Sequence, residues 1–160
     1  LASVTIHDEP RLVVCSPRHR LARARTVDAA MLAEDAWIGF PSRPDGPAEP
    51  STASLRHCLA ACGLGDPEII AIDSLTAQKR MVEAGFGLAL LPESSVDEEL
   101  RMGTLRALRV PAMRVTIPVV MIHRRCAYLS GAARGLMAVF KAKPMRRVEH
   151  GRRSEPRRSS

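Results

Sequence analysis

The sequence has no long uninterrupted apolar run. None of its 160 residues lies in a stretch approaching the roughly 18 to 20 consecutive apolar residues that a membrane-spanning helix requires, so we expect no transmembrane span and no membrane partner. The first ten residues, LASVTIHDEP, have neither the basic start nor the long apolar centre of a signal peptide. Because the chain begins with Leu1, we expect it to be a piece of a longer product.

Cysteine is scarce and no two cysteines form a Cys-x-x-Cys pair. The cysteines are Cys15, Cys58, Cys62 and Cys126. Cys58 and Cys62 share one helical stripe with Leu55 and Leu59, which favours small core residues over a metal site or a thiol redox sensor. His57 projects away from this stripe, so the ligand set of a metal site is incomplete. We expect reduced thiols, a cytoplasmic location and no metal.

Catalytic motifs are also missing. The chain contains no G-x-S-x-G elbow, Walker-type loop, H-E-x-x-H pair or complete dinucleotide fingerprint. The corner at 85–87 follows a helical pattern instead of a strand, which is the wrong context for gripping phosphate. His19 and His123 remain as possible bases, but no nucleophile or paired carboxylate stands beside either. We expect no enzymatic activity and no cofactor.

The net charge of +7 lies mainly in the last residues. Residues 143–160 contain seven Lys or Arg and two Glu, which leaves 17 basic and 15 acidic residues in the rest of the chain. The segment 142–160 is predicted to be a disordered, solvated tail. The alternative is a basic arm that touches phosphates without reading sequence.

Short apolar runs alternate with helical patterns along the chain. With 46% apolar residues, the chain can bury one core that divides into two lobes. The predicted strands are 11–17, 36–42, 67–73, 87–92, 104–110 and 117–125. The predicted helices are 26–34, 51–63, 75–84, 95–103 and 130–142. This alternation predicts an α/β fold with a mainly parallel sheet and flanking helices.

Local signals predict several helix ends. Thr26 is expected to cap the first helix, and Ser74 and Gly85 the start and end of the helix between them. Residues 95–98 fit a capping box, with Gly103 ending that helix.

The last predicted helix and one strand carry the clearest burial patterns. Ser130 is expected to cap the helix, and its buried face is predicted to comprise Ala133, Leu136, Met137 and Phe140. The run 87–92 does not alternate between apolar and polar residues, which is typical of a strand covered on both faces.

Two turns follow predicted strands and carry hydrogen-bonding or apolar side chains. In α/β sheets, ligands bind beyond the carboxyl ends of strands, where helix N-termini point free N–H groups outward. Phe40 and Ser42 lie at the end of one predicted strand, and Ser74 and Thr76 follow another. These four are the candidate effector-binding residues, and the alternative for the hydroxyls is simple turn or capping duty.

Four stretches in order resemble the effector-binding domain of LysR-type transcriptional regulators. They are RLVVCSPRHRLA, AEDAWIGFPS, IDSLTAQKRMVEAGFGLALLPESSVDEELRMGTLRAL and YLSGAARGLMAVF. They carry a Pro-x-His-x-Leu-Ala element, a V-x-A-G-x-G element ending in Leu-Pro, and an L-S-x-A-A-R helix. The resemblance covers residues 10 to 141.

The resemblance implies a periplasmic-binding-protein-like (type 2) architecture with one complete lobe and part of a second. Residues 1–11 would cross from the first lobe, 12–103 would form the second lobe, and 104–141 would return to the first. The winged helix-turn-helix and linker helix of the family are absent, so DNA would be bound only through an N-terminal domain outside this chain.

The resemblance also implies a role for the chain. It would bind a small effector between the lobes, with Gly85, Gly87 and Pro92 as a structural corner near that cleft. The hydroxyls and helix ends favour a small organic anion as that effector. A homo-oligomer, dimer or tetramer, is expected, with the helix 75–84 and Met81 as contacts. The alternatives are a transporter's solute-binding protein and a nonfunctional truncated remnant.

Overall fold

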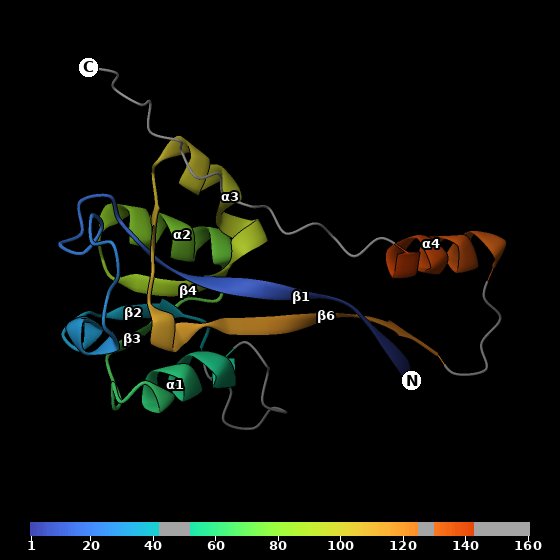
Figure 1. Cartoon of the computed structure of the whole chain (residues 1–160), viewed down its shortest axis with the longest axis horizontal. Helices are drawn as coiled ribbons and strands as arrows, with labels where there is room; N and C mark the ends of the chain where they lie inside the picture. The colour runs from blue at the N-terminus through green and yellow to red at the C-terminus, as the bar shows by residue number, and fades with distance from the viewer. Residues whose placement is uncertain (42–51, 125–129, 143–160) are drawn as a thin grey trace, which may run out of the picture. The chain divides into compact units, whose positions relative to one another are not determined.

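The computed structural model describes residues 1–41, 52–124 and 130–142 (Figure 1). The strands are β1 (Ala2–Cys15), β2 (Trp37–Gly39), β3 (Ile69–Ala71), β4 (Leu88–Pro92), β5 (Arg106–Leu108) and β6 (Val115–His123). The α-helices are α1 (Thr52–Ala61), α2 (Leu75–Ala84), α3 (Glu93–Met102) and α4 (Gly131–Ala142). Two short 3-10 helices are η1 (Ala29–Leu32) and η2 (Pro111–Met113). Residues 143–160 of the predicted tail and Cys126 fall outside the described residues.

The chain divides into two compact units. The central unit is Asp8–Ile117, and the terminal unit combines Leu1–His7 with Pro118–Ser160. The strands β1 and β6 contribute residues to both units. The central unit contains the described candidate site residues.

The sheet is mixed. Its strand order is β3-β2-β4-β1-β5, and β6 pairs with β1. β2 runs parallel to β3 and β4, whereas β1 runs antiparallel to β4 and β5. The α/β class is confirmed. The parallel arrangement does not extend to β1. Residues 16–36 leave the end of β1 and enter β2 at the same end of the sheet, so the chain reverses direction between the two strands.

Helices cover both faces of this sheet within the central unit. Figure 1 shows α1 on one face and α2 with α3 on the other. In β4, Leu88 and Leu90 join the cluster on the α1 side, and Ala89 and Leu91 join the cluster on the α2 side. All four are buried, so the prediction of a strand covered on both faces is confirmed.

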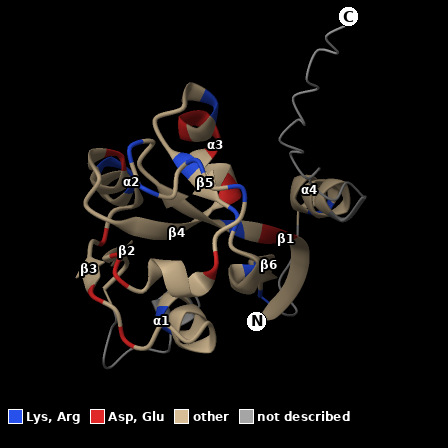
Figure 2. Cartoon of the chain, turned by 60° about the vertical axis from the view of Figure 1, so that its left-hand side comes forward, with Lys and Arg blue, Asp and Glu red and all other residues tan. Residues whose placement is uncertain are grey.

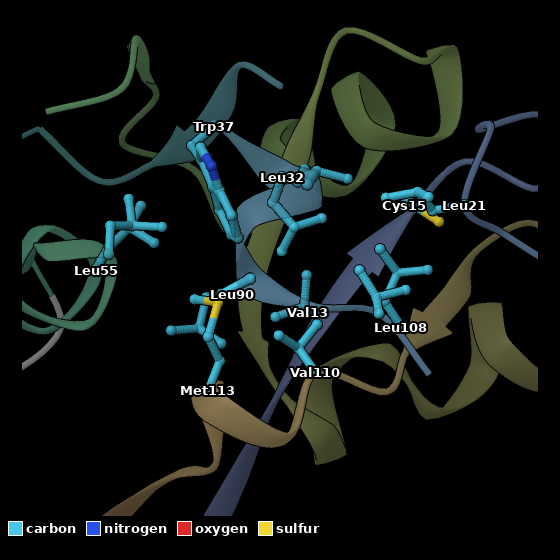
Figure 3. Close-up of a cluster of buried hydrophobic side chains, with 14 residues drawn as sticks. Val13, Cys15, Leu21, Leu32, Trp37, Leu55, Leu90, Leu108, Val110 and Met113 are labelled. Carbon is cyan, nitrogen blue, oxygen red and sulfur yellow. The ribbon is translucent and has the colours of Figure 1, made fainter. Parts of the chain in front are cut away.

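The larger cluster lies on the α1 side and includes Trp37. Figure 3 shows Trp37 with Leu32, Leu55, Leu90 and other members of this cluster. The indole is fully buried. Burying large apolar side chains contributes roughly 1.5 to 3 kcal/mol each, so this cluster is a main source of stability for the central unit.

Four helix caps agree with the sequence predictions. The Ser74 side chain caps α2, and Gly85 ends it with φ of 89°, in the left-handed region. Ser130 Oγ accepts a hydrogen bond from Ala133 N at 3.2 Å at the start of α4. Gly103 also ends α3 as predicted, with φ of 77°. In each case the signal lies within a few residues of the helix end.

Two other predicted caps are wrong. Instead of a helix capped by Thr26, the structure has the short η1, and Asp28 caps it by accepting a hydrogen bond from Ala30 N at 3.0 Å. The capping box at 95–98 does not form because α3 begins earlier, at Glu93.

The start of α3 is capped from a distant strand. Its N-cap residue is Pro92, which has no side-chain hydrogen bond to the helix. Glu9 of β1 supplies the acceptor, because its Oε1 binds Ser94 N at 3.2 Å and also accepts from Ser94 Oγ. The two residues are 85 positions apart, so no local pattern could reveal this cap.

The predicted buried face of α4 is only partly buried. Leu136 is 56% exposed, while Ala133, Met137 and Phe140 are half-buried. The described part of the terminal unit offers two strand segments and this helix. The predicted burial of this face is therefore only partly confirmed.

Charged residues of both signs are interspersed on α2 and α3 (Figure 2). Lys79 Nζ lies 2.5 Å from Glu99 Oε1 and donates to Ser95 O at 3.0 Å, which joins the two helices. The pKa of Glu99 lies below its ordinary value. Burial alone would raise this pKa, but hydrogen bonds and the charge of Lys79 lower it by more. Among the described residues, no helix is long and apolar enough to cross a membrane.

Candidate functional site

The turns that carry the candidate residues lie at one edge of the sheet. β2 and β3 run parallel and in register to their last residues. Phe40 follows β2, and Ser74 and Thr76 follow β3 at the start of α2. The structure therefore brings these three residues to the same edge, which we call the carboxyl edge. Ser42 lies outside the described residues.

Ser74 performs the capping duty, and its geometry leaves a donor available. Its Oγ accepts a hydrogen bond from Ala77 N at 3.4 Å, and its carbonyl accepts from Gln78 N at 2.9 Å. A hydroxyl can accept and donate at the same time. Ser74 is exposed, so its hydroxyl can cap α2 and still donate a hydrogen bond to a ligand.

Thr76 adds a second exposed hydroxyl in the first turn of α2. The free N–H groups and the positive dipole end of a helix start favour anions. Phe40 is half-buried and offers apolar surface at the same edge. Asp73 is exposed and adds one negative charge, so the donors at this helix start are hydroxyl and backbone groups and not positively charged side chains.

The neighbouring helix start already holds a carboxylate. α3 follows β4 and begins at the same carboxyl edge, where Glu9 binds the backbone and side chain of Ser94. A carboxylate from the chain itself thus occupies one helix start at this edge. The start of α2 has the same polarity and is exposed to solvent at Ser74 and Thr76.

Arg11 is a buried cation at this edge that sequence reasoning missed. It lies opposite Pro92, at the end of β4, and is only 8% exposed. Burial lowers the pKa of its guanidinium, while Cys58 and Glu9 oppose that effect. The only sequence signal was a charged residue at the head of an apolar strand run.

Gln78 was also missed. It lies on the α2 face that packs on the sheet and is 1% exposed, although its side chain is polar. Its Nε2 donates to Ile72 O at 2.7 Å. A polar residue at a helix position that periodicity assigns to the core was the available signal.

The glycine corner lies at the opposite edge of the sheet. Gly85 and Gly87 precede β4 at its amino end, where Leu88 N donates to Ala36 O at 2.9 Å. Pro92 closes β4 at the carboxyl edge. The corner therefore shapes the entry into β4, and only Pro92 stands near the candidate site residues.

His19 has a structural role, because its side chain connects two segments of the chain. Its Nε2 lies 3.1 Å from Asp35 Oδ1, and its Nδ1 accepts from Leu21 N at 3.2 Å. Arg20 Nη2 donates to the other Asp35 oxygen at 2.9 Å. The carboxylate is thus shared between a histidine and an arginine, which anchors the loop after β1 to the turn before β2.

The thiols in the described residues also have structural surroundings. Cys15 is buried, Cys58 and Cys62 are partly buried, and all three are free. Burial raises the pKa of Cys15 to about 11, which keeps the thiol protonated and unreactive at neutral pH. Within residues 1–41, 52–124 and 130–142, no group of three or more His, Cys, Asp or Glu could hold a metal ion.

Comparison with known families gives one extensive match. The family model described as the LysR substrate binding domain matches residues 1–144. HTH-type transcriptional regulators of Mycobacterium bovis and Mycobacterium tuberculosis are each 30% identical over 116 residues, which is 72% of this chain. The chain spans 37% of the length of these regulators.

Solved structures share the fold. The regulatory domain of Synechocystis PCC6803 CcmR in complex with 2-PG aligns with a TM-score of 0.74 and 15% identity, covering 88% of this chain and 65% of that one. The effector-binding domain of QuiR in complex with shikimate gives 0.65 and 19%, covering 88% and 64%. The C-terminal domain of a probable LysR family regulator from Rhodococcus sp. RHA1 gives 0.66 and 19%, covering 87% and 66%.

Proposed function

Because this chain belongs to the family of LysR substrate-binding domains, we propose that it senses a small organic anion at the start of α2 and thereby controls a transcriptional regulator. The main support for this proposal is the arrangement of donors at the carboxyl edge of the sheet. There Ser74 and Thr76 expose two hydroxyls at a helix start, and the adjacent helix start already binds the carboxylate of Glu9.

We propose that the ligand is a small organic acid bound by donors from several elements. Ser74 and Thr76 would donate to its acidic group, while Phe40 would contact its carbon skeleton. Ser42 remains part of this proposed set. The ligands of two structural neighbours, 2-PG and shikimate, make these compounds sensible first probes. The proposed role is sensing and not catalysis.

We also propose how the rest of the protein acts. Residues 12–103 would form one lobe of the sensor, and 1–11 with 104–141 would belong to the other. DNA would be bound by a domain outside this chain in a cytoplasmic homo-oligomer. α2 would contribute to the pairing of subunits; Met81 packs partly against the core, which leaves the rest of its side chain for such a contact.

The proposal predicts that the two hydroxyls matter for the ligand and not for DNA. In the full-length protein, Ser74→Ala combined with Thr76→Val is expected to weaken binding of the responsive probe by roughly ten- to hundredfold, the usual effect of losing hydrogen bonds to a charged group. Calorimetric titration with shikimate and 2-PG measures this affinity, and DNA binding is measured in parallel by fluorescence anisotropy.

Ser130→Ala is the matched control, because Ser130 caps α4 as Ser74 caps α2 but lies in the terminal unit. This control should leave ligand affinity unchanged. Loss of DNA binding in the double variant, or equal loss of affinity in the control, would argue against a ligand contact at the start of α2.

A further inference from the structure

Gln78 is one of three buried polar or charged side chains in the described part of the chain. It stands on α2 among the residues that face the sheet, one turn before the fully buried Val82. At 1% exposure it cannot touch a ligand in solution. A polar side chain in such a position needs internal hydrogen-bond partners, which suggests a positional requirement for the amide group.

The Gln78 amide binds the turn that precedes α2. Its Nε2 donates to Ile72 O at 2.7 Å. The N–H of Ile72 donates in turn to Gly39 O at 2.8 Å. Both backbone polar groups of Ile72 are therefore engaged, one with the end of β2 and the other with α2.

This short chain of hydrogen bonds connects the two turns of the candidate site. Gly39 immediately precedes Phe40, and Ile72 lies two residues before Ser74, whose carbonyl and hydroxyl bind the first turn of α2. A shift of Ile72 would move the start of α2 relative to the end of β2. The separation between Phe40 and the two hydroxyls thus depends on the Ile72 position.

We propose that Gln78 is a positioning residue that sets the spacing between Phe40 and the Ser74–Thr76 turn, and thereby the affinity for the effector. This inference rests on the proposed function of that turn. An apolar residue would fill the same space but would release the Ile72 carbonyl. Gln78→Met is therefore the informative variant, because methionine has a similar length and no donor.

Amide hydrogen exchange in the full-length protein tests the positioning without a ligand. Gln78→Met is expected to raise exchange at least fivefold in peptides covering 72–77, with a smaller rise at 38–41. Val82→Ala is the matched control, because it removes packing from the same face of α2 and leaves the amide in place. At equal loss of thermal stability, the control should raise exchange across α2 and β4 without favouring 72–77.

Ligand titration with shikimate and 2-PG tests the functional part. Gln78→Met should weaken binding of the responsive probe by about tenfold or more, while Val82→Ala should change it less than twofold. Unchanged exchange at 72–77, or equal effects of both variants, would overturn the positioning role. A wild-type protein that binds neither probe would count against the proposed ligand class, and the exchange result would still decide on Gln78.

Discussion

The two glycines before β4 serve different physical needs. Gly85 ends α2 with a positive φ of 89°, a conformation that side chains disfavour. Gly87 has no such φ, but a Cβ there would lie 2.4 Å from Ala36 O and 3.0 Å from Ala36 C. Those atoms belong to the backbone, and Leu88 N donates a hydrogen bond to Ala36 O. Glycine at 87 is therefore required by a close approach of two chain segments.

Gly87→Ala is predicted to destabilise the central unit by about 1 to 3 kcal/mol, the usual cost of forcing an extra methyl group into a packed site. The fluorescence of Trp37, which is the only tryptophan and is fully buried in this unit, reports its unfolding in urea. Gly135→Ala is the control, because a Cβ at this position in α4 meets nothing within 4 Å. A wild-type midpoint for Gly87→Ala would contradict the close-approach argument.

The roles of single residues could be predicted from the sequence where those roles depend only on neighbouring residues. Ser74 was found because a serine before a helical pattern is a cap. Gln78 and Arg11 were not found, because their importance depends on their burial in the folded chain. Thr26 failed as a cap since Asp28, two residues later, accepts the hydrogen bond that starts η1.

At the level of elements, α3 is a helix whose N-terminus is capped by a side chain from a strand. Pro92 ends β4 and is the N-cap residue of α3, but it makes no side-chain hydrogen bond to the helix. The first turn of α3 therefore depends on Glu9 from β1. The carboxylate also lies at the positive end of the α3 dipole. One contact thereby caps a helix and ties β1 to the β4–α3 connection.

This dependence predicts which substitutions at the start of α3 destabilise the protein most. Glu9→Ala is expected to destabilise the protein by about 1 to 2 kcal/mol, as for loss of a strong N-cap. Ser94→Ala should cost less, because Ser94 N still donates to Glu9. Urea denaturation of both variants and of the double variant gives the coupling energy.

Glu98→Ala serves as the control in this series, since Glu98 is an exposed residue within α3. Its midpoint should stay close to that of the wild type. Additive effects of Glu9→Ala and Ser94→Ala would show that the two side chains do not act as one cap.

At the level of the whole molecule, the two units differ in how well they cover their apolar residues. The central unit has a cluster on each face of its sheet. In the terminal unit, several large apolar side chains are exposed: Val119, Val120, Ile122, Leu136 and Val139. Exposed apolar surface of this kind promotes association.

We therefore predict that residues 8–117 produced alone unfold in one cooperative transition and remain monomeric, whereas the 160-residue chain self-associates. Sedimentation velocity and Trp37 fluorescence measure the two properties. Substituting Ile122→Lys and Leu136→Lys in the 160-residue chain should reduce association without moving the Trp37 midpoint. A monomeric 160-residue chain at about 100 μM would contradict the role assigned to this exposed apolar surface.

The sequence by itself determined the α/β class and the ends of α2, because these follow from apolar patterns and caps within a few residues of each other. It also indicated the LysR family, through the resemblance of four ordered stretches. Only the tertiary structure decided the reversed direction of β1, the Glu9 cap on α3, the need for glycine at 87 and the buried bond of Gln78. The first three depend on contacts between segments far apart along the chain, and local patterns carry no information about such contacts. The Gln78 bond spans only six positions, but its burial depends on the packing of α2 on the sheet.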